Sequence, residues 1–136
     1  AKMSKSKNNT IDVFLPEKKL RKQVMGIATD STPLEAPKNP DACTVFALYS
    51  LIAQTADVAA MRKKYESGGF GYGHAKQALC EAILERFSDA RTKFDDFMAH
   101  PELLEAQLQK GAVKARGVAQ EVLQRVRKNL GYTTAV

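Results

Sequence analysis

The stretch His74-Ala-Lys-Gln-Ala-Leu-Cys-Glu-Ala-Ile-Leu-Glu-Arg-Phe87 decides the fold, because its apolar residues recur three or four positions apart. That spacing is typical of a helix with one apolar face, and it continues far enough to predict a helix over roughly 74–98. We expect the apolar face of this helix to lie in a core. Its members are Leu79, Ile83, Phe87, Ala90, Phe94 and Phe97.

Three more helices are predicted upstream of this one. The first begins at Pro16, which suits a first helical position, and ends before Thr29. Helical spacing then recurs over roughly 42–54 and 57–65. Asp41 directly precedes the second of these helices and can cap it. A glycine-rich break separates the third from the long helix.

Two further helices are predicted downstream, a short one near 102–109 and a last one at about 112–129. Gly111 separates them. The apolar side of the last helix is formed by Ala115, Val118, Ala119, Val122, Val126 and Leu130. The fold class expected from these patterns is all-α, an antiparallel bundle of four to five helices behind an extended basic amino-terminal loop.

The composition excludes several classes of protein. The chain has 136 residues and a mass of 15.0 kDa, and 44% of its residues are hydrophobic, although none is Trp. This hydrophobic fraction is enough for a modest core. No apolar run approaches the ~20 residues that span a bilayer, and no secretory signal is visible. Its two cysteines, Cys43 and Cys80, are too few for a disulfide framework or a zinc ribbon. We therefore expect two reduced thiols packed in the core, no metal site, no membrane contact and a cytoplasmic location.

The net charge of +6 is concentrated at two places in the chain. Residues 1–25 hold seven basic and two acidic side chains, residues 110–128 hold six basic and one acidic, and the segment between them is acidic. Such clusters favour contact with polyanions, for example RNA or nucleotide phosphates. The alternative is that amphipathic helices simply present charged outer faces to water.

The segment Lys2-Met-Ser-Lys-Ser6 places two lysines three residues apart in a small, hydroxyl-rich loop. Two ammonium groups there could neutralise a triphosphate, because negative charge builds on the leaving pyrophosphate when a nucleotidyl group is transferred. Lysine suits this task as a compact point charge, and a loop can close and open around its substrate. The alternative for an arbitrary Lys/Ser segment is a disordered basic tail. The run Ile11-Asp-Val-Phe-Leu15 that follows is compatible with a strand stub or with a helical turn.

The five-residue string at 2–6 resembles, at all five positions, the signature loop of class I aminoacyl-tRNA synthetases. Further segments resemble the bacterial-type tryptophanyl-tRNA synthetases in particular. They are Lys22-Gln-Val-Met-Gly-Ile-Ala-Thr-Asp-Ser31, Arg62-Lys-Lys-Tyr-Glu-Ser-Gly-Gly-Phe-Gly-Tyr-Gly-His-Ala-Lys76 and Lys110-Gly-Ala-Val-Lys-Ala-Arg116. The resemblance covers essentially all of residues 2–131, in order.

The resemblance implies a tryptophan–tRNA ligase activity. Members of the family join tryptophan to ATP, release pyrophosphate and pass the acyl group to the terminal ribose of tRNA(Trp), with Mg²⁺ accompanying ATP. Carried over to this sequence, Lys2 and Lys5 would be the catalytic residues that neutralise the phosphates. Met3, Ser4 and Ser6 would complete the ATP-binding loop. The family also implies a homodimer.

The same resemblance implies that the chain is the carboxy-terminal part of such an enzyme. Residues 1–15 would be the loop and a remnant of the catalytic domain, residues 16–131 the helical anticodon-side domain, and residues 132–136 a tail. The family's His-x-Gly-His motif belongs to a Rossmann-type domain that this chain lacks. Gly71-Tyr-Gly-His74 only echoes that motif, because it begins with Gly and follows the loop. We therefore expect the chain to be inactive alone.

Contact with tRNA is predicted for the basic residues near the carboxyl end, and a merely solvated face explains them equally well. These residues are Lys110, Lys114, Arg116, Arg125, Arg127 and Lys128. Contact with tRNA and a solvated face are also the two explanations for the cations of the first helix. These are Lys18, Lys19, Arg21 and Lys22. The candidates for stacking on bases are few, namely Tyr65, Phe70 and Tyr72.

The remaining conspicuous residues are expected to be structural. Gly69-Phe-Gly-Tyr-Gly73 lacks the spacing of a phosphate-binding motif and predicts a turn. His74 and His100 fall at helix ends, and the adjacent Asp95 and Asp96 point to different sides of a helix. Two other classes of function remain open: a stand-alone helical RNA-binding module without catalysis, and a helical scaffold whose basic ends are incidental.

Overall fold

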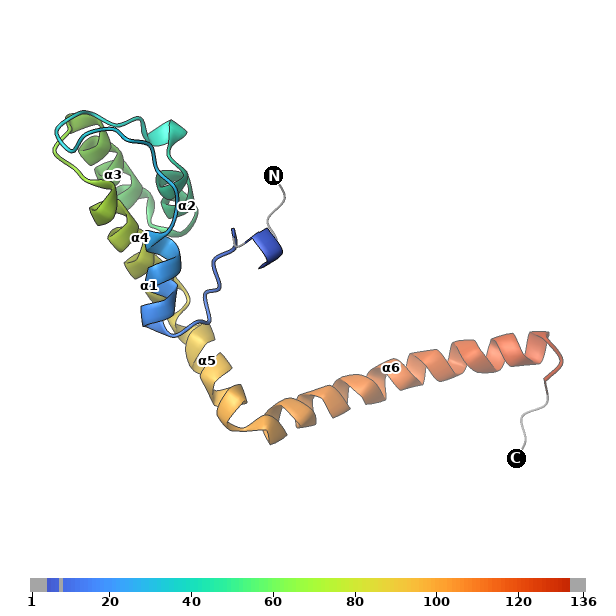
Figure 1. Ribbon diagram of the computed structural model, residues 1–136. Helices are drawn as coiled ribbons and strands as arrows, with labels where there is room; N and C mark the ends of the chain where they lie inside the picture. The colour runs from blue at the N-terminus through green and yellow to red at the C-terminus, as the bar shows by residue number, and fades with distance from the viewer. Residues whose placement is uncertain (1–4, 8, 133–136) are drawn as a thin grey trace. The chain divides into compact units, whose positions relative to one another are not determined.

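The computed structural model describes residues 5–7 and 9–132, and within them every regular element is helical (Figure 1). The prediction of an all-α fold is confirmed. The helices are α1 (Glu17–Met25), α2 (Thr44–Ile52), α3 (Thr55–Ser67), α4 (Tyr72–Arg86), α5 (Ser88–Ala99) and α6 (Pro101–Asn129). Single 3-10 turns cover Lys5–Lys7 and Pro40–Ala42.

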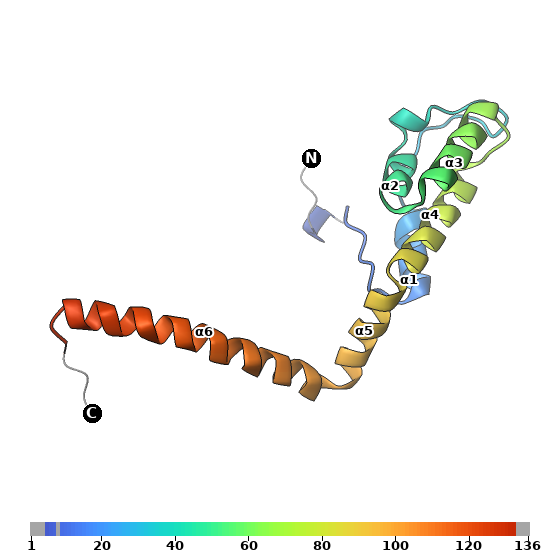
Figure 2. The ribbon, with the colours of Figure 1, turned by 180° about the vertical axis from the view of Figure 1, so that it is seen from behind.

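The chain divides into two compact units, one ending at Thr92 and the other beginning at Lys93. In the first unit α4 packs against both α1 and α2, and α2 also packs against α3 (Figures 1 and 2). The second unit contains α6 and most of α5. The functional boundaries predicted at residues 15 and 131 stay predictions.

The core of the first unit is formed by the apolar faces that the sequence predicted for its four helices. The buried residues at helical spacing in these four helices are Leu20, Val24, Val45, Met61, Tyr65, Leu79 and Ile83. Burying one such leucine fully contributes about 1.5–3 kcal/mol, which offsets the ordering of one or two residues of backbone. The helices that surround α4 are therefore held by the same periodic residues that reveal them in the sequence.

Both cysteines lie in this core, as predicted, and neither forms a disulfide. Burial raises the pKa of the Cys80 thiol, so this group stays protonated at neutral pH. The Cys43 sulfur lies 3.5 Å from the hydroxyl oxygen of Tyr65. Burial also raises the pKa of that phenol, with the Cys43 contact as the next cause. Cys80 therefore acts as a small apolar group, whereas Cys43 is a hydrogen-bond partner of the buried Tyr65.

The prediction of one long helix over 74–98 was wrong, because the backbone leaves the helical conformation at Phe87 (φ −106°, ψ 13°). Ser88 and Asp89 follow this break, and an acidic residue in a first turn favours a new helix start. Phe94 and Phe97, which were expected in the core, are 38% and 39% exposed. Periodicity identifies an apolar face, but it does not show that another helix lies opposite.

The prediction of two separate helices at 102–109 and 112–129 was also wrong. Pro101 opens the helix as expected, but α6 then continues without a break through Gly111 and Gly117. A glycine inside a helix costs only about 1 kcal/mol relative to alanine, which a long helix tolerates. No residue of α6 is buried, so its predicted apolar face is not part of a core in this structure.

The start of α2 differs from the prediction, because a 3-10 turn precedes it. Cys43 occupies the N-cap position, with no side-chain capping bond, and Asp41 lies inside the turn. The Asp41 carboxylate instead accepts two hydrogen bonds from Arg62, at 2.6 and 3.2 Å. The Arg62 guanidinium also lies 5.0 Å from the centre of the Phe46 ring. Asp41, which was expected to cap α2, therefore ties the turn before α2 to Arg62 of α3.

The proline-rich connector between α1 and α2 is held by a buried lysine. Lys38 is 4% exposed, and its ammonium group donates to the carbonyl oxygens of Pro33, Leu34 and Ala36 at 2.8–3.3 Å. Three donors on one ammonium match these three carbonyls, which satisfies a charge that burial would otherwise penalise. The connector is therefore a fixed part of the first unit.

The glycine-rich junction between α3 and α4 packs against this connector. Gly68 and Gly69 have φ angles of +75° and +72°, which favour glycine. The Gly69 amide donates to the Leu34 carbonyl oxygen at 3.0 Å. A Cβ atom on Gly68 would lie 2.4 Å from the Glu35 carbonyl oxygen. The predicted turn is present at Gly69–Gly71, whereas Tyr72 and Gly73 already belong to α4. The close approach to Glu35 explains why position 68 needs glycine.

Candidate functional site

The proposed nucleotide loop lies at the amino-terminal edge of the described residues. Lys2, Met3 and Ser4 lie outside them. Lys5 and Ser6 begin the 3-10 turn Lys5–Lys7, and Ser6 is exposed. The roles predicted for these five residues in catalysis and ATP binding therefore stay predictions.

The chain joins the core of the first unit a few residues after this loop. Ile11, Val13 and Leu15 alternate with exposed residues and pack against the core. The Leu15 amide donates to the Asp12 carbonyl oxygen at 3.3 Å, and the Phe14 amide donates to the Asp12 carboxylate at 3.0 Å. The sequence left a strand stub and a helical turn open for this run, and the structure forms a turn. This turn fixes the point from which the loop extends.

Two long side chains from other parts of the first unit hold the same turn. The Gln23 side-chain oxygen accepts a hydrogen bond from the Asp12 amide at 3.1 Å. The Arg91 guanidinium donates to the carbonyl oxygens of Val13 and Leu15, the latter at 2.9 Å. Sequence reasoning missed both residues. Gln23 lies 11 positions from Asp12, Arg91 lies 76 or more positions from its acceptors, and no local pattern reveals such contacts.

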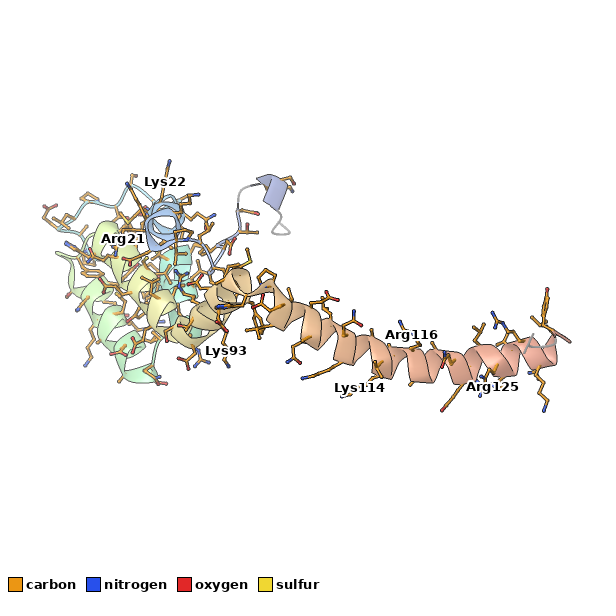
Figure 3. The ribbon with its side chains drawn as sticks, turned by 90° about the horizontal axis from the view of Figure 1, so that it is seen from below. Arg21, Lys22, Lys93, Lys114, Arg116 and Arg125 are labelled. Atoms are coloured by element: carbon orange, nitrogen blue, oxygen red, sulfur yellow. The ribbon has the colours of Figure 1, made fainter. Side chains whose placement is uncertain are left out.

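The basic residues of α6 fall on two edges of one continuous helix. At about 100° per residue, Lys110, Lys114, Arg125 and Lys128 lie within a sector of about 60°, which we call the basic edge. Arg116 and Arg127 lie close to the opposite side. All six side chains are exposed, and Figure 3 labels Lys114, Arg116 and Arg125 along the helix. The unbroken helix therefore aligns Lys110 with the cations that follow Gly111.

Apolar side chains fill one flank of α6, between the basic edge and the side that carries Arg116 and Arg127. Its larger members are Leu104, Leu108, Val118, Val122, Leu123, Val126 and Leu130, each at least 43% exposed. The helix thus presents a basic edge beside an apolar stripe. The predicted amphipathic character of this segment is confirmed, and its contact with tRNA stays a prediction.

The cations of α1 point to water, as expected from the spacing. Lys18, Lys19 and Lys22 are exposed, and Arg21 pairs with the Glu17 carboxylate at 3.2 Å. Figure 3 shows Arg21 and Lys22 on this helix. An exposed pair of this kind contributes well under 1 kcal/mol, so the α1 cations carry no structural task that would exclude a role in binding.

Of the three aromatic candidates for stacking on bases, Tyr65 is excluded, because it is fully buried. The centres of the Phe70 and Tyr72 rings lie 5.7 and 6.1 Å from that of Tyr65, and both side chains are partly exposed. The Tyr72 hydroxyl donates to the Asp30 carboxylate at 2.8 Å. Hydrogen bonds from Thr32 and then from Tyr72 lower the pKa of Asp30, so its carboxylate is charged at neutral pH. These aromatic rings mainly build the core.

The two histidines lie at helix ends, as predicted. His74 is in the first turn of α4, and His100 is the N-cap residue of α6. The His100 Nδ1 atom lies 3.1 Å from the Asp96 carboxylate. Within residues 5–7 and 9–132, no group of three or more His, Cys, Asp or Glu side chains could hold a metal ion.

A cavity of about 400 Å³ lies in the first unit. It is lined by Tyr49, Ile52, Ala53, Gln54, Asp57, Ala78, Glu81, Ala82, Glu85 and Arg86. Three carboxylates against one guanidinium make its lining acidic, which disfavours phosphate groups. The cavity is therefore not a site for the nucleotide or for the RNA backbone.

Known proteins resemble this chain along nearly its whole length, although no family model matches it. The tryptophan–tRNA ligase of Rhodopirellula baltica is 46% identical over 130 residues, which cover 96% of this chain and 41% of that protein. The ligase of Campylobacter jejuni is 43% identical over 131 residues, with the same coverage. The crystal structure of the C. jejuni tryptophanyl-tRNA synthetase matches with a TM-score of 0.92, over 96% of this chain and 42% of that chain.

The chain belongs to the tryptophan–tRNA ligase family. It spans about 41% of the length of the curated relatives that it matches. A second structure of the C. jejuni enzyme, complexed with ADP and tryptophan, matches with the same TM-score. The resemblance inferred from the four sequence segments is thereby confirmed. None of the helices in the described part of this ligase-family chain is long and apolar enough to cross a membrane.

Proposed function

We propose that the full-length protein is a tryptophan–tRNA ligase and that this chain supplies its nucleotide loop and its helical, RNA-contacting part. The observation that carries the proposal is the match to ligases of this specificity over 96% of the chain. The C. jejuni structure that holds ADP and tryptophan supports ATP and tryptophan as substrates. The loop Lys2-Met-Ser-Lys-Ser6 supplies the matching chemistry.

In the proposed reaction the tryptophan carboxylate attacks the α-phosphorus of ATP, and the bond to the bridging oxygen breaks. Negative charge then builds on the departing pyrophosphate. The ammonium groups of Lys2 and Lys5 neutralise that charge, while Met3, Ser4 and Ser6 shape the loop and bind the nucleotide. Mg²⁺ enters with ATP as part of the substrate. The terminal ribose hydroxyl of tRNA(Trp) then attacks the acyl carbon and releases AMP.

The remaining features of the proposal concern partners and location. The full-length ligase is a cytoplasmic homodimer, and no membrane takes part. Lys110, Lys114, Arg125 and Lys128 form the surface that meets the tRNA backbone, because four cations share that edge and only Arg116 and Arg127 share the other. Arginine and lysine held along one line of a helix suit a row of phosphates.

Aminoacylation by the full-length protein tests this function. We expect it to charge tRNA(Trp) with tryptophan and to exchange pyrophosphate into ATP only when tryptophan is present. The 136-residue chain alone should do neither, because it matches only about 41% of a ligase. Assays with each of the twenty amino acids check the specificity. A full-length protein that binds tRNA but charges it with nothing would favour a stand-alone RNA-binding module instead.

Replacing Lys114 and Arg125 together by Gln should weaken tRNA binding by this chain about tenfold at moderate salt. Each lost phosphate contact should also reduce the slope of log Kd against log salt by about 0.7–0.9. Filter binding at several salt concentrations measures both quantities. The matched control replaces Arg116 and Arg127 by Gln, which removes the same charge from the other edge. Equal losses in the two double variants would show that the basic edge has no special role.

A further inference from the structure

We propose that Arg91 is a positioning residue for the nucleotide loop, assisted by Gln23. The inference rests on the proposed function, in which Lys5 acts on ATP. Its basis is a turn at Asp12–Leu15 that Arg91 and Gln23 hold against the helical core. We call this turn the anchor.

Arg91 lies in the first turn of α5, four residues after the break at Phe87. Its Nη1 atom donates to two backbone carbonyls, those of Val13 and Leu15. One nitrogen with two N–H bonds can satisfy both acceptors. Within the part of the chain that the structure describes, Arg91 forms no ion pair with a carboxylate. Its charge is therefore committed to the anchor.

Gln23 holds the opposite end of the anchor from α1, where its side-chain oxygen accepts from the Asp12 amide. Both attaching residues, Gln23 and Arg91, belong to the first unit. In Figures 1 and 2 the segment before α1 runs beside the first turn of α5. The anchor therefore connects the amino-terminal segment to the helical core at two independent points.

This arrangement limits where Lys5 can be. Asp12 lies seven positions after Lys5, and an extended chain spans at most about 3.5 Å per position. A fixed Asp12 thus keeps Lys5 within about 25 Å of the helical core. A released anchor would lengthen the tether and lower the effective concentration of the ammonium group at its target. Arg91 acts on catalysis through this restraint and does not touch the substrate.

The first test measures amide hydrogen exchange in the 136-residue chain. We expect Arg91→Ala to speed exchange of the Phe14 and Leu15 amides about tenfold, because the anchor then opens more often. The amides of α4 should not change. Lys93→Ala is the matched control, since it removes an exposed cation from the same helix (Figure 3). Unchanged exchange in Arg91→Ala would overturn the proposal. If Arg91→Ala does not fold, Gln23→Leu takes its place. We then expect faster exchange of the Asp12 amide, and unchanged exchange would overturn the proposal.

The second test measures tryptophan-dependent pyrophosphate exchange in the full-length protein. Arg91→Ala should lower kcat about tenfold with little change in KM for tryptophan, and Arg91→Lys should recover part of the loss. Faster amide exchange with unchanged kcat would show a merely structural contact and overturn the positioning role. A wild-type protein without exchange activity would instead overturn the proposed function, while the amide-exchange result would still decide whether the anchor exists.

Discussion

Lys5→Ala in the full-length ligase should lower kcat for tryptophan-dependent pyrophosphate exchange about 100-fold, because removal of one group that stabilises transition-state charge costs about 100- to 1,000-fold. The loss should fall on kcat more than on KM for ATP, since the charge on pyrophosphate builds only as the α-phosphate bond breaks. Steady-state kinetics with ATP as the varied substrate measure both constants.

Lys7→Ala is the matched control for this prediction. Lys7 is an exposed cation two residues after Lys5, and it lies outside the five-residue loop. Its loss changes the local net charge by the same amount, so a general electrostatic effect would affect both variants equally. We expect less than about a threefold change in kcat for Lys7→Ala, because the charge that matters in the transition state is the one nearest the pyrophosphate. A similar kcat in the two variants would remove Lys5 from the catalytic group.

The sequence predicts the four helices of the first unit well, because burial and periodicity agree there. Leu20, Val24, Leu79 and Ile83 are spaced as helix faces, and each of them is buried. The same reasoning failed at Phe94, whose spacing is equally regular but whose side chain is 38% exposed. Spacing depends on the local sequence alone, whereas burial depends on which element lies opposite. Helical spacing therefore predicts which segments are helices more reliably than it predicts which of their side chains are buried.

The candidate site also has parts that the sequence predicts and parts that it does not. The nucleotide loop and the basic edge are visible in the sequence, because their chemistry depends on neighbouring residues or on helical spacing. Arg91 and Lys38 are not visible, since their partners are backbone carbonyls, which every residue possesses. A lysine between proline and asparagine gives no sign that it will be buried. Contacts to the backbone are therefore the part of this molecule that only the structure reveals.

One such backbone contact gives the largest expected change in stability. Gly68→Ala should lower the free energy of unfolding of the first unit by about 3 kcal/mol. Roughly 1–3 kcal/mol comes from forcing an L-residue to a φ of +75° with a ψ of 176°, a region that only glycine readily adopts. About 1–3 kcal/mol more comes from the clash of its Cβ with the Glu35 carbonyl oxygen. That carbonyl cannot move away easily, because Lys38 holds the connector around it.

Gly69→Ala is the control that separates backbone strain from the clash. Gly69 has nearly the same φ, but a Cβ there would meet nothing within 4 Å, so we expect a loss of only about 1 kcal/mol. Urea unfolding followed by near-ultraviolet circular dichroism suits both variants, because the chain has no Trp and the buried Tyr65 reports on the first unit. Far-ultraviolet signals would also include α6, which has no buried residue and need not unfold with the core. Equal losses at the two glycines would mean that the connector yields to the new methyl group and that Lys38 does not hold it in place.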